Sequence, residues 1–225
     1  GLNKKIDVIV PRGGKSLVER VERDAKVPVF GHLDGICHIY IDKYADIKKA
    51  VDITFNAKMR RPGICGAAET VLIHKDSISL ILPSLCKKLV DAGCEIRGCK
   101  NVQNLFSNAV QATEKDWSTE YLLPIISIKS VDNLTSAINH IYKFSSGHTE
   151  SIITENKENA EIFLSKVDSA IVMHNTSTQF ADGGEFGFGG EIGISTNKLP
   201  PRGPVGLNQL TSYKYIVKGK GITRP

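Results

Sequence analysis

The residue with the most reactive chemistry in this sequence is Cys65, which stands between two glycines and follows a cluster of Lys58, Arg60 and Arg61. A cysteine is a strong nucleophile only as the thiolate, and neighbouring cations favour that form. Glycine has no Cβ, so the chain can turn sharply there and a substrate can approach closely. The stretch predicts a nucleophilic cysteine, with a buried cysteine of no chemical role as the alternative.

The other four cysteines have no comparable setting: Cys37, Cys86, Cys94 and Cys99. Cys86 and Cys94 lie in or beside an apolar helical pattern and are expected in the core. No spacing suits the ligands of a zinc site, so we expect no metal. The odd number of cysteines and the lack of a signal peptide predict a reducing, cytoplasmic location.

A possible anion site is formed by Arg12, Gly13 and Gly14, which follow a β-rich run and precede a helical pattern. The free N–H groups and the dipole of a helix N-terminus attract anions. The sequence Gly-Lys-Ser at this point is like the end of a P-loop, but Ile9 stands where that motif needs another glycine. We expect a contact to a cofactor phosphate or to the nicotinamide side, or else an ordinary strand–helix turn.

Two further stretches could serve a site. His32 and Asp34 lie between two predicted strands, where His32 could act as an acid or base near pH 7, or both could merely complete a turn. The glycine-rich stretch 183–191 could surround a substrate with backbone donors, or it could cross between domains.

The elements that would position these residues alternate between strand and helix. This order predicts an α/β fold with a largely parallel sheet. The expected strands are 6–10, 27–30, 36–41, 70–73, 95–98, 124–129, 151–154 and 169–173. The expected helices are 15–25, 45–60, 80–92, 133–144 and 156–166. A last strand over 210–218 has no neighbour in the sequence to pair with, so we expect it to pair with another subunit.

The composition is ordinary for a globular protein, with 225 residues, 41% hydrophobic and 24% charged. The net charge is +5, but the basic residues are scattered, which argues against nucleic-acid binding and is compatible with a small anionic substrate. No apolar run approaches the roughly 20 residues that cross a bilayer, so no membrane association is expected.

Several of these stretches together resemble the gamma-glutamyl phosphate reductase family (glutamate-5-semialdehyde dehydrogenases) of the aldehyde dehydrogenase superfamily. The resemblance extends over essentially the whole chain. The matching stretches are VPRGGKSL (10–17), HLDGICH (32–38), NAKMRRPGICGAAET (56–70), STQFADGGEFG (177–187) and RGPVGL (202–207).

The resemblance implies an aldehyde dehydrogenase-like fold and a division of the chain into four parts. The implied parts are the end of a Rossmann-like NADP-binding domain (1–35), a catalytic domain with a parallel sheet flanked by helices (36–175), a glycine-rich connection (176–209) and an oligomerisation strand (210–225). A homo-oligomer is therefore expected.

The resemblance also implies an activity, the NADPH-dependent reduction of L-glutamyl 5-phosphate to L-glutamate 5-semialdehyde and phosphate in proline biosynthesis. Cys65 matches the nucleophile that forms a thioester. The expected cofactor contacts are Arg12, Gly13, Gly14, His32 and Glu120. Arg60 and Arg61 are expected to favour the thiolate or to hold substrate anions, and Asn175 to contact the substrate. A functional link to glutamate 5-kinase is implied as well.

The chain departs from this family in length, because relatives have nearly as many residues again before its first residue. Three alternatives follow. The chain could be half of a split enzyme whose N-terminal half is a separate chain, a truncated inactive remnant, or a non-catalytic α/β interaction module.

Overall fold

The computed structural model describes residues 5–31 and 33–225, and its centre is a seven-stranded sheet. The strand order is β4-β3-β5-β2-β1-β6-β7, and every pairing in this sheet is parallel. The strands are β1 (Cys37–Ile41), β2 (Ala68–His74), β3 (Glu95–Gly98), β4 (Val110–Gln111), β5 (Ile125–Val131), β6 (Thr149–Ile153) and β7 (Ile171–His174). The predicted α/β fold with a parallel sheet is confirmed.

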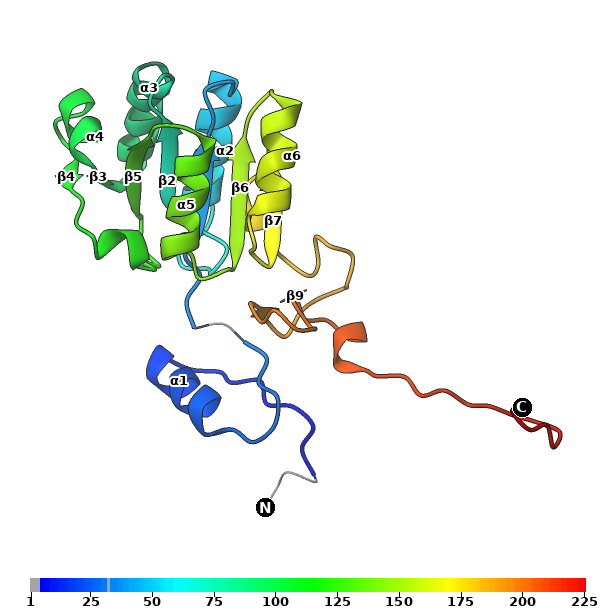
Figure 1. Ribbon diagram of the computed structural model, residues 1–225. Coiled ribbons are helices and arrows are strands. Elements are labelled where there is room, and N and C mark those ends of the chain that lie inside the picture. Colours follow the sequence, from blue (N-terminus) through cyan, green and yellow to red (C-terminus); the bar gives the residue numbers. More distant parts are fainter. Residues whose placement is uncertain (1–4, 32) are drawn as a thin grey trace.

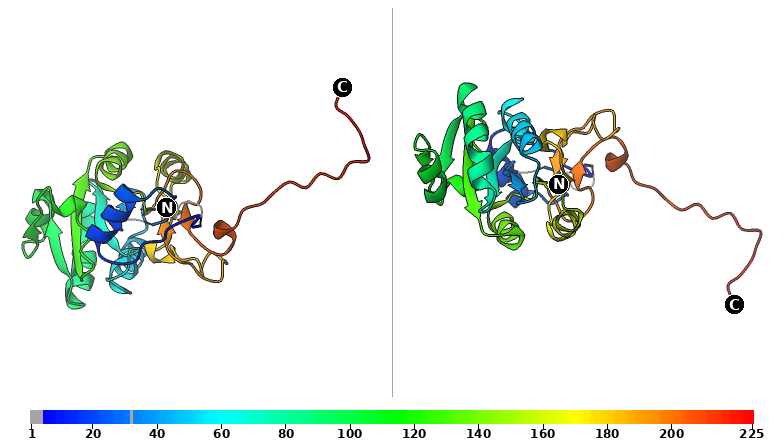
Figure 2. Two further views of the ribbon diagram at one scale, coloured as in Figure 1. Left: turned by 90° about the horizontal axis from the view of Figure 1, so that it is seen from below. Right: turned by 90° about the horizontal axis from the view of Figure 1, so that it is seen from above.

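Helices cover both faces of the sheet (Figures 1 and 2). One face carries α2 (Ile47–Met59), α3 (Ile78–Asp91) and α4 (Lys100–Leu105). The other face carries α5 (Leu134–Phe144) and α6 (Lys157–Lys166). Because β5 is followed by a strand on the far side of β1, the helices after it must pack on the opposite face.

The core is divided by the sheet into two layers. On one face, Leu82 and Leu85 of α3 pack against Ile39 and Val71. On the other face, Phe163 of α6 packs in the second layer, with its ring stacked near Tyr40. Strands covered on both faces carry continuous apolar runs, which is why the central strands were predictable from composition.

The N-terminal segment differs from its prediction. It contains α1 (Lys15–Asp24), but the expected strands over 6–10 and 27–30 are reduced to one bridge between Ile9 and Val29. The hydrogen bonds there run from Ile9 N to Pro28 O and from Phe30 N to Ile9 O, both 2.9 Å. Pro11 and Pro28 have no N–H to donate, so the pairing cannot extend.

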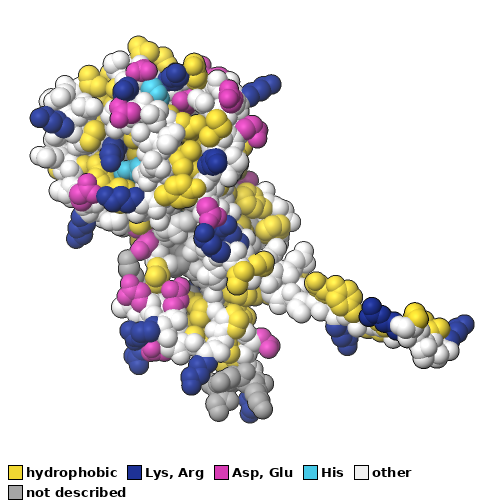
Figure 3. All heavy atoms as spheres, viewed as in Figure 1, with side chains coloured by type: hydrophobic (Ala, Val, Ile, Leu, Met, Phe, Trp, Pro, Cys, Tyr) yellow, Lys and Arg dark blue, Asp and Glu magenta, His cyan; other side chains and the backbone are white. Residues whose placement is uncertain are grey.

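The C-terminal part contains a small antiparallel pair, β8 (Ile194–Ser195) and β9 (Gly203–Pro204). After η4 (Asn208–Leu210), residues 211–225 extend away from the rest of the chain with hydrophobic and basic side chains exposed (Figures 1 and 3). The strand predicted over 210–218 is not formed within the described residues. A strand requires a partner's backbone groups, and Tyr213, Tyr215 and Val217 are all exposed here.

The polar region 99–115, to which the sequence assigned no element, contains α4 and the short strand β4. It is followed by η2 (Asp116–Ser118). In α4 only Val102 is buried, so its sequence has no apolar periodicity to detect. Across the described residues, no helix has the length and apolar character needed to span a membrane.

Candidate active site

Cys65 lies in the loop between α2 and β2, at the edge of the sheet where the parallel strands begin. Gly35 precedes β1 and Glu120 precedes β5, so both belong to the same edge. Ligands of open α/β sheets usually bind at the opposite edge, outside the carboxyl ends of the strands. The loops of this chain instead meet at the amino edge.

The Cys65 loop packs directly against the residues that enter β1. A Cβ atom at Gly35 would lie 2.4 Å from the Cys65 carbonyl oxygen and 2.7 Å from its Cα, so only glycine fits. The N–H of Gly35 donates to Glu120 Oε1 at 2.9 Å, and Cys37 Sγ donates to the Cys65 carbonyl at 3.1 Å. These contacts bring Glu120 close to the Cys65 loop, whereas its expected contact with a cofactor stays a prediction.

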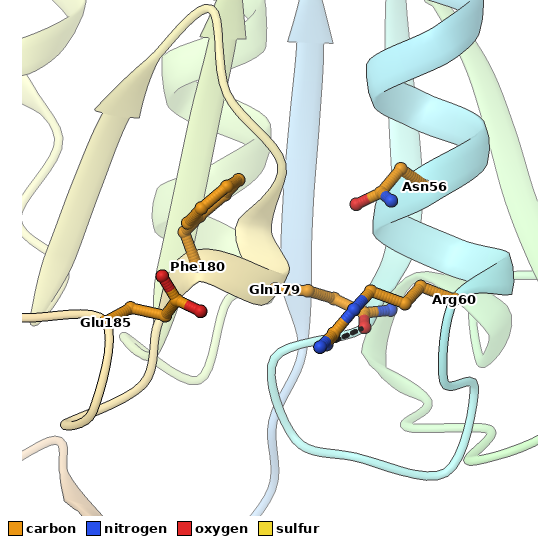
Figure 4. A pocket seen from close by; sticks show the side chains of 5 residues that line it. All are labelled: Asn56, Arg60, Gln179, Phe180 and Glu185. Carbon is orange, nitrogen blue, oxygen red and sulfur yellow. Dashed lines mark hydrogen bonds between the residues drawn. The ribbon is translucent and has the colours of Figure 1, made fainter.

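The other side of the loop contacts η3 (Thr178–Phe180). A Cβ at Gly66 would lie 3.3 Å from the Thr178 carbonyl oxygen. Gln179 is 6% exposed and donates from Nε2 to the carbonyl of Ala57 at 2.8 Å. Its Oε1 accepts a 3.3 Å hydrogen bond from Arg60 Nη1 (Figure 4). A buried amide therefore joins the end of α2 to the segment that follows β7.

Two adjoining cavities open at this place. The larger, of about 320 Å³, is lined by Arg60, Arg61, Ile64, Cys65, Gly66, Gln179, Ala181, Asp182, Glu185 and Glu191. The smaller, of about 110 Å³, is lined by Asn56, Arg60, Gln179, Phe180 and Glu185 (Figure 4). The cations come from the end of α2, and the carboxylates come from the glycine-rich stretch. The larger cavity thus presents a thiol between walls of opposite charge.

The electrostatics of the thiol differ from the prediction. Burial, and after it the carboxylates of Glu120 and Glu191, raise the pKa of Cys65 to about 11, although the N–H groups of Cys65 and Gly66 lower it. Neither Arg60 nor Arg61 is among the groups that shift this pKa. The pKa is thus dominated by burial and acidic groups, so the thiol is neutral near pH 7, and the role expected for Arg60 and Arg61 in favouring the thiolate or holding substrate anions stays a prediction.

The direction of Lys58 explains part of this difference. Its Nζ lies 2.5 Å from Glu69 Oε2, and both side chains are completely buried. Glu69 Oε1 accepts a 3.3 Å hydrogen bond from the N–H of Leu122, which has a φ of 54°. Because Leu122 follows Glu120 by two residues, the buried ion pair supports the segment that carries the Glu120 carboxylate.

The residues predicted to contact a cofactor are not all in one place. Arg12 and Gly13 line a cavity of about 170 Å³ between the N-terminal segment and Ile192–Ile194, and Arg12 Nη2 donates to the carbonyl of Ile192. Gly14 is the exposed N-cap residue of α1. His32 lies outside the described residues.

Asn175 is not brought to these cavities. It follows β7, and its N–H donates to the carbonyl of Ile152 at 2.9 Å. Its Oδ1 accepts from the Thr154 N–H and its Nδ2 donates to the Thr154 carbonyl, both at 3.0 Å. These contacts place Asn175 at the carboxyl edge of the sheet, opposite Cys65, which corrects the predicted proximity.

Sequence reasoning missed several residues at this site. They are Gly35, Gln179, Asp182, Glu185 and Glu191. Three of these are acids within or beside the glycine-rich stretch, and that composition was the available signal. The contact made by Gly35 had no signal, because it depends on two loops that meet only in the folded chain.

Comparison with known proteins shows which proteins this chain is similar to. Residues 102–216, about half of the chain, match the aldehyde dehydrogenase family. The chain is 58% identical over 225 residues to the gamma-glutamyl phosphate reductase of Hyphomonas neptunium and equally identical to that of Rhizobium etli, covering all of this chain and 53% of each relative. The chain thus spans about half the length of the curated relatives it matches.

Solved structures agree with these sequence matches. The gamma-glutamyl phosphate reductase of Thermotoga maritima superimposes with a TM-score of 0.97 at 49% identity, over 100% of this chain and 54% of that one. An acetylating aldehyde dehydrogenase from Geobacillus thermoglucosidasius shares the fold, with a TM-score of 0.69 at 17% identity over 96% of this chain and 59% of that one. The chain belongs to the aldehyde dehydrogenase family.

Proposed function

We propose that this chain forms the catalytic part of a reductase that converts L-glutamyl 5-phosphate to L-glutamate 5-semialdehyde and phosphate, a step of proline biosynthesis from glutamate. The relatives reported above carry the name gamma-glutamyl phosphate reductase, which supports this proposal. The observation that carries the proposal is the half-buried Cys65 thiol in a cavity that also presents two guanidinium groups. A thiol beside anion-binding groups suits attack on an acyl phosphate.

In the proposed reaction, Cys65 Sγ attacks the acyl carbonyl carbon. A C–S bond forms, the C–O bond to phosphate breaks, and the products are a thioester and inorganic phosphate. Because the pKa of the thiol is about 11, the thiol must give up its proton as it attacks. We assign the carboxylate of Glu191, which lines the same cavity and whose charge acts on this thiol, as the group that receives that proton.

Backbone groups assist the same step. The N–H groups of Cys65 and Gly66 point toward the sulfur and stabilise negative charge there. Donors fixed in place before the reaction lower a barrier more than mobile water does, because they need no reorganisation. Arg60 and Arg61 are assigned to the anionic groups of the substrate.

A nicotinamide cofactor, NADPH in this proposal, supplies when bound the hydride that reduces the thioester to the aldehyde. The residues present fit such a group. The cavity lined by the exposed Arg12 and by Gly13, which has no Cβ to obstruct an approach, suits a phosphate, with Gly14 beside it at the start of α1. The Glu120 carboxylate suits a sugar hydroxyl, and we retain His32 as a further contact.

Two accessory features belong to the proposal. All five cysteines are free thiols, which supports a reducing compartment such as the cytoplasm. The extended residues 211–225, whose side chains are all exposed, are proposed to pair with a second copy of the chain to give a homo-oligomer.

The test is to trap the thioester. The chain is mixed with L-glutamyl 5-phosphate, generated in place by a glutamate 5-kinase and ATP, and the peptide that contains Cys65 is weighed by mass spectrometry. We expect an acyl adduct at Cys65 and none in Cys65→Ala. A wild-type chain without an adduct would contradict the proposal. An adduct that NADPH does not reduce would identify a chain that acylates but needs a separate half for hydride transfer.

A further inference from the structure

Two adjoining cavities, the larger of which is also lined by Cys65, share a cation and an anion that face each other. Arg60 and Glu185 line both cavities. Arg60 comes from the end of α2 and Glu185 from the glycine-rich stretch, and they lie on opposite sides of the opening (Figure 4). Among the described residues no ion pair joins them, so both charges remain available to a ligand.

Each of the two charges is held in place by the chain. The buried Gln179 donates its amide N–H to Ala57, so its oxygen is left to accept from Arg60. The turn that presents Glu185 is fixed by Asp182, whose Oδ1 accepts from the N–H of Gly184 at 2.8 Å and of Glu185 at 3.2 Å. Charges fixed before binding cost less to order when a ligand arrives.

We propose that Arg60 and Glu185 form a subsite for the α-amino-acid end of the substrate, in which Arg60 binds the α-carboxylate and Glu185 binds the α-ammonium. This assignment rests on the proposed function, because it takes the acyl group to lie at Cys65 in the larger cavity. Arg61 lines only that larger cavity, together with Cys65, and is left for the phosphate. A guanidinium suits both anions because it donates in a planar fork.

The arrangement would make the site selective for zwitterions. An acyl compound that lacks the ammonium leaves Glu185 without its partner, and one that lacks the carboxylate leaves Arg60 without its partner. A site that pairs a polar group of the ligand discriminates against the analogue without that group. Both side chains are exposed, so we expect each pairing to change the affinity by about fivefold and not by orders of magnitude.

The experiment uses three stable esters that differ at one position. They are L-glutamate 5-methyl ester, monomethyl glutarate, which lacks the ammonium, and methyl 4-aminobutyrate, which lacks the carboxylate. Each is tested for protection of Cys65 from iodoacetamide, read as the labelled fraction of its peptide by mass spectrometry. For the wild type we expect L-glutamate 5-methyl ester to protect at about fivefold lower concentration than either analogue.

Three variants separate the two pairings. Glu185→Gln removes the preference over monomethyl glutarate and keeps the preference over methyl 4-aminobutyrate. Arg60→Gln does the reverse. Glu158→Gln, an exposed position at the start of α6, keeps both preferences. The labelled fraction of Cys65 measured without any ester shows whether the Cys65 loop of each variant keeps its wild-type structure.

The outcomes distinguish this subsite from the thioester chemistry. If Glu185→Gln keeps the full preference for the amino ester, or if no ester protects a wild-type chain that does form the acyl adduct, the subsite is overturned and the proposed function stands. If the esters protect in the expected order but no adduct forms, the subsite stands and the thioester chemistry is overturned.

Discussion

The inner and outer sides of the last turn of α2 use cations in opposite ways. Lys58 points inward, where its side chain is completely buried against Glu69. Arg60 points outward, where its guanidinium contacts Gln179 and lines the cavities beside Cys65. Positions two apart on a helix differ by about 200° in direction, so neighbouring cations separate into two environments. Charges that are adjacent in the sequence need not act on the same group.

The two environments also differ in what the charges do energetically. Inside the protein, both members of an ion pair have lost their hydration, so removing one leaves a buried charge without compensation. At the surface, water screens the charges and an ion pair adds little to stability. The inner side should therefore control folding, and the outer side should control ligand binding.

The largest effect is expected from Lys58→Met, on the inner side of α2. We expect the free energy of unfolding to fall by about 3–5 kcal/mol, because the substitution leaves the Glu69 carboxylate buried without its cation. Urea denaturation of the chain, followed by circular dichroism, measures the change. The loop at Leu122 should loosen as well, since its N–H is bonded to the same carboxylate.

The matched control is Lys48→Met on the same helix. Lys48 pairs with Asp52 at 2.6 Å, but its side chain is exposed, so its removal should leave the urea midpoint unchanged. In a double variant, Glu69→Leu added to Lys58→Met should recover most of the loss, because no charge then remains buried. Equal urea midpoints for Lys48→Met and Lys58→Met would contradict the inference that the buried cation of α2 stabilises the fold more than the exposed one.

A smaller effect is expected from Gln179→Leu, because Gln179 contacts both the buried backbone of α2 and the exposed Arg60. The substitution removes the hydrogen bond to the Ala57 carbonyl and the one from Arg60, at a cost of about 1–2 kcal/mol in unfolding free energy. It should also weaken the protection of Cys65 by L-glutamate 5-methyl ester, because Arg60 loses its support.

Gln103→Leu provides the control for that variant. Gln103 also donates a side-chain hydrogen bond to a backbone carbonyl, that of Ala109 at 3.3 Å, but it lies on α4 away from the cavities. Its loss should lower stability without changing the protection of Cys65. If both variants weaken protection equally, the role of Gln179 is only structural.

The inner side of the molecule was more predictable from sequence than the outer side. β2 is buried along its whole length, so its apolar run identified a strand without knowledge of its neighbours. The strand expected over 210–218 needs the backbone groups of a partner, which the described residues of a single chain do not supply. The contact between Gly35 and Cys65 depends on two loops that only the folded sheet brings together.

The candidate site shows the same division. Cys65 was found because its flanking glycines and cations are local signals. The same local pattern groups the cations with the thiol as one cluster, although the helix predicted over 45–60 implies that Lys58 and Arg60 point in different directions. The acids that raise the pKa of the thiol come from Glu120 and Glu191, far away in the sequence, and no local pattern identifies them.

The smallest effect is expected at the thiol itself. With a pKa of about 11, Cys65 is almost entirely neutral at pH 8, and its alkylation should become faster as the pH rises toward 11. Glu191→Gln removes a negative charge, which lowers the pKa and increases the thiolate fraction. A thiolate of lower pKa is also a weaker nucleophile, so the net gain in alkylation rate at pH 8 should be about twofold.

Glu191→Gln keeps a side-chain oxygen that can accept from the N–H of Gly183, which the carboxylate now binds at 2.9 Å, so the glycine-rich stretch should hold its position. Glu158→Gln should leave the rate unchanged. Arg61→Met should also leave the alkylation–pH profile unchanged, because burial and the carboxylates dominate the pKa of this thiol. If the profile of Arg61→Met moves to higher pH, Arg61 stabilises the thiolate of Cys65. The exposed cations near the end of α2 would then activate the thiol as well as bind the ligand.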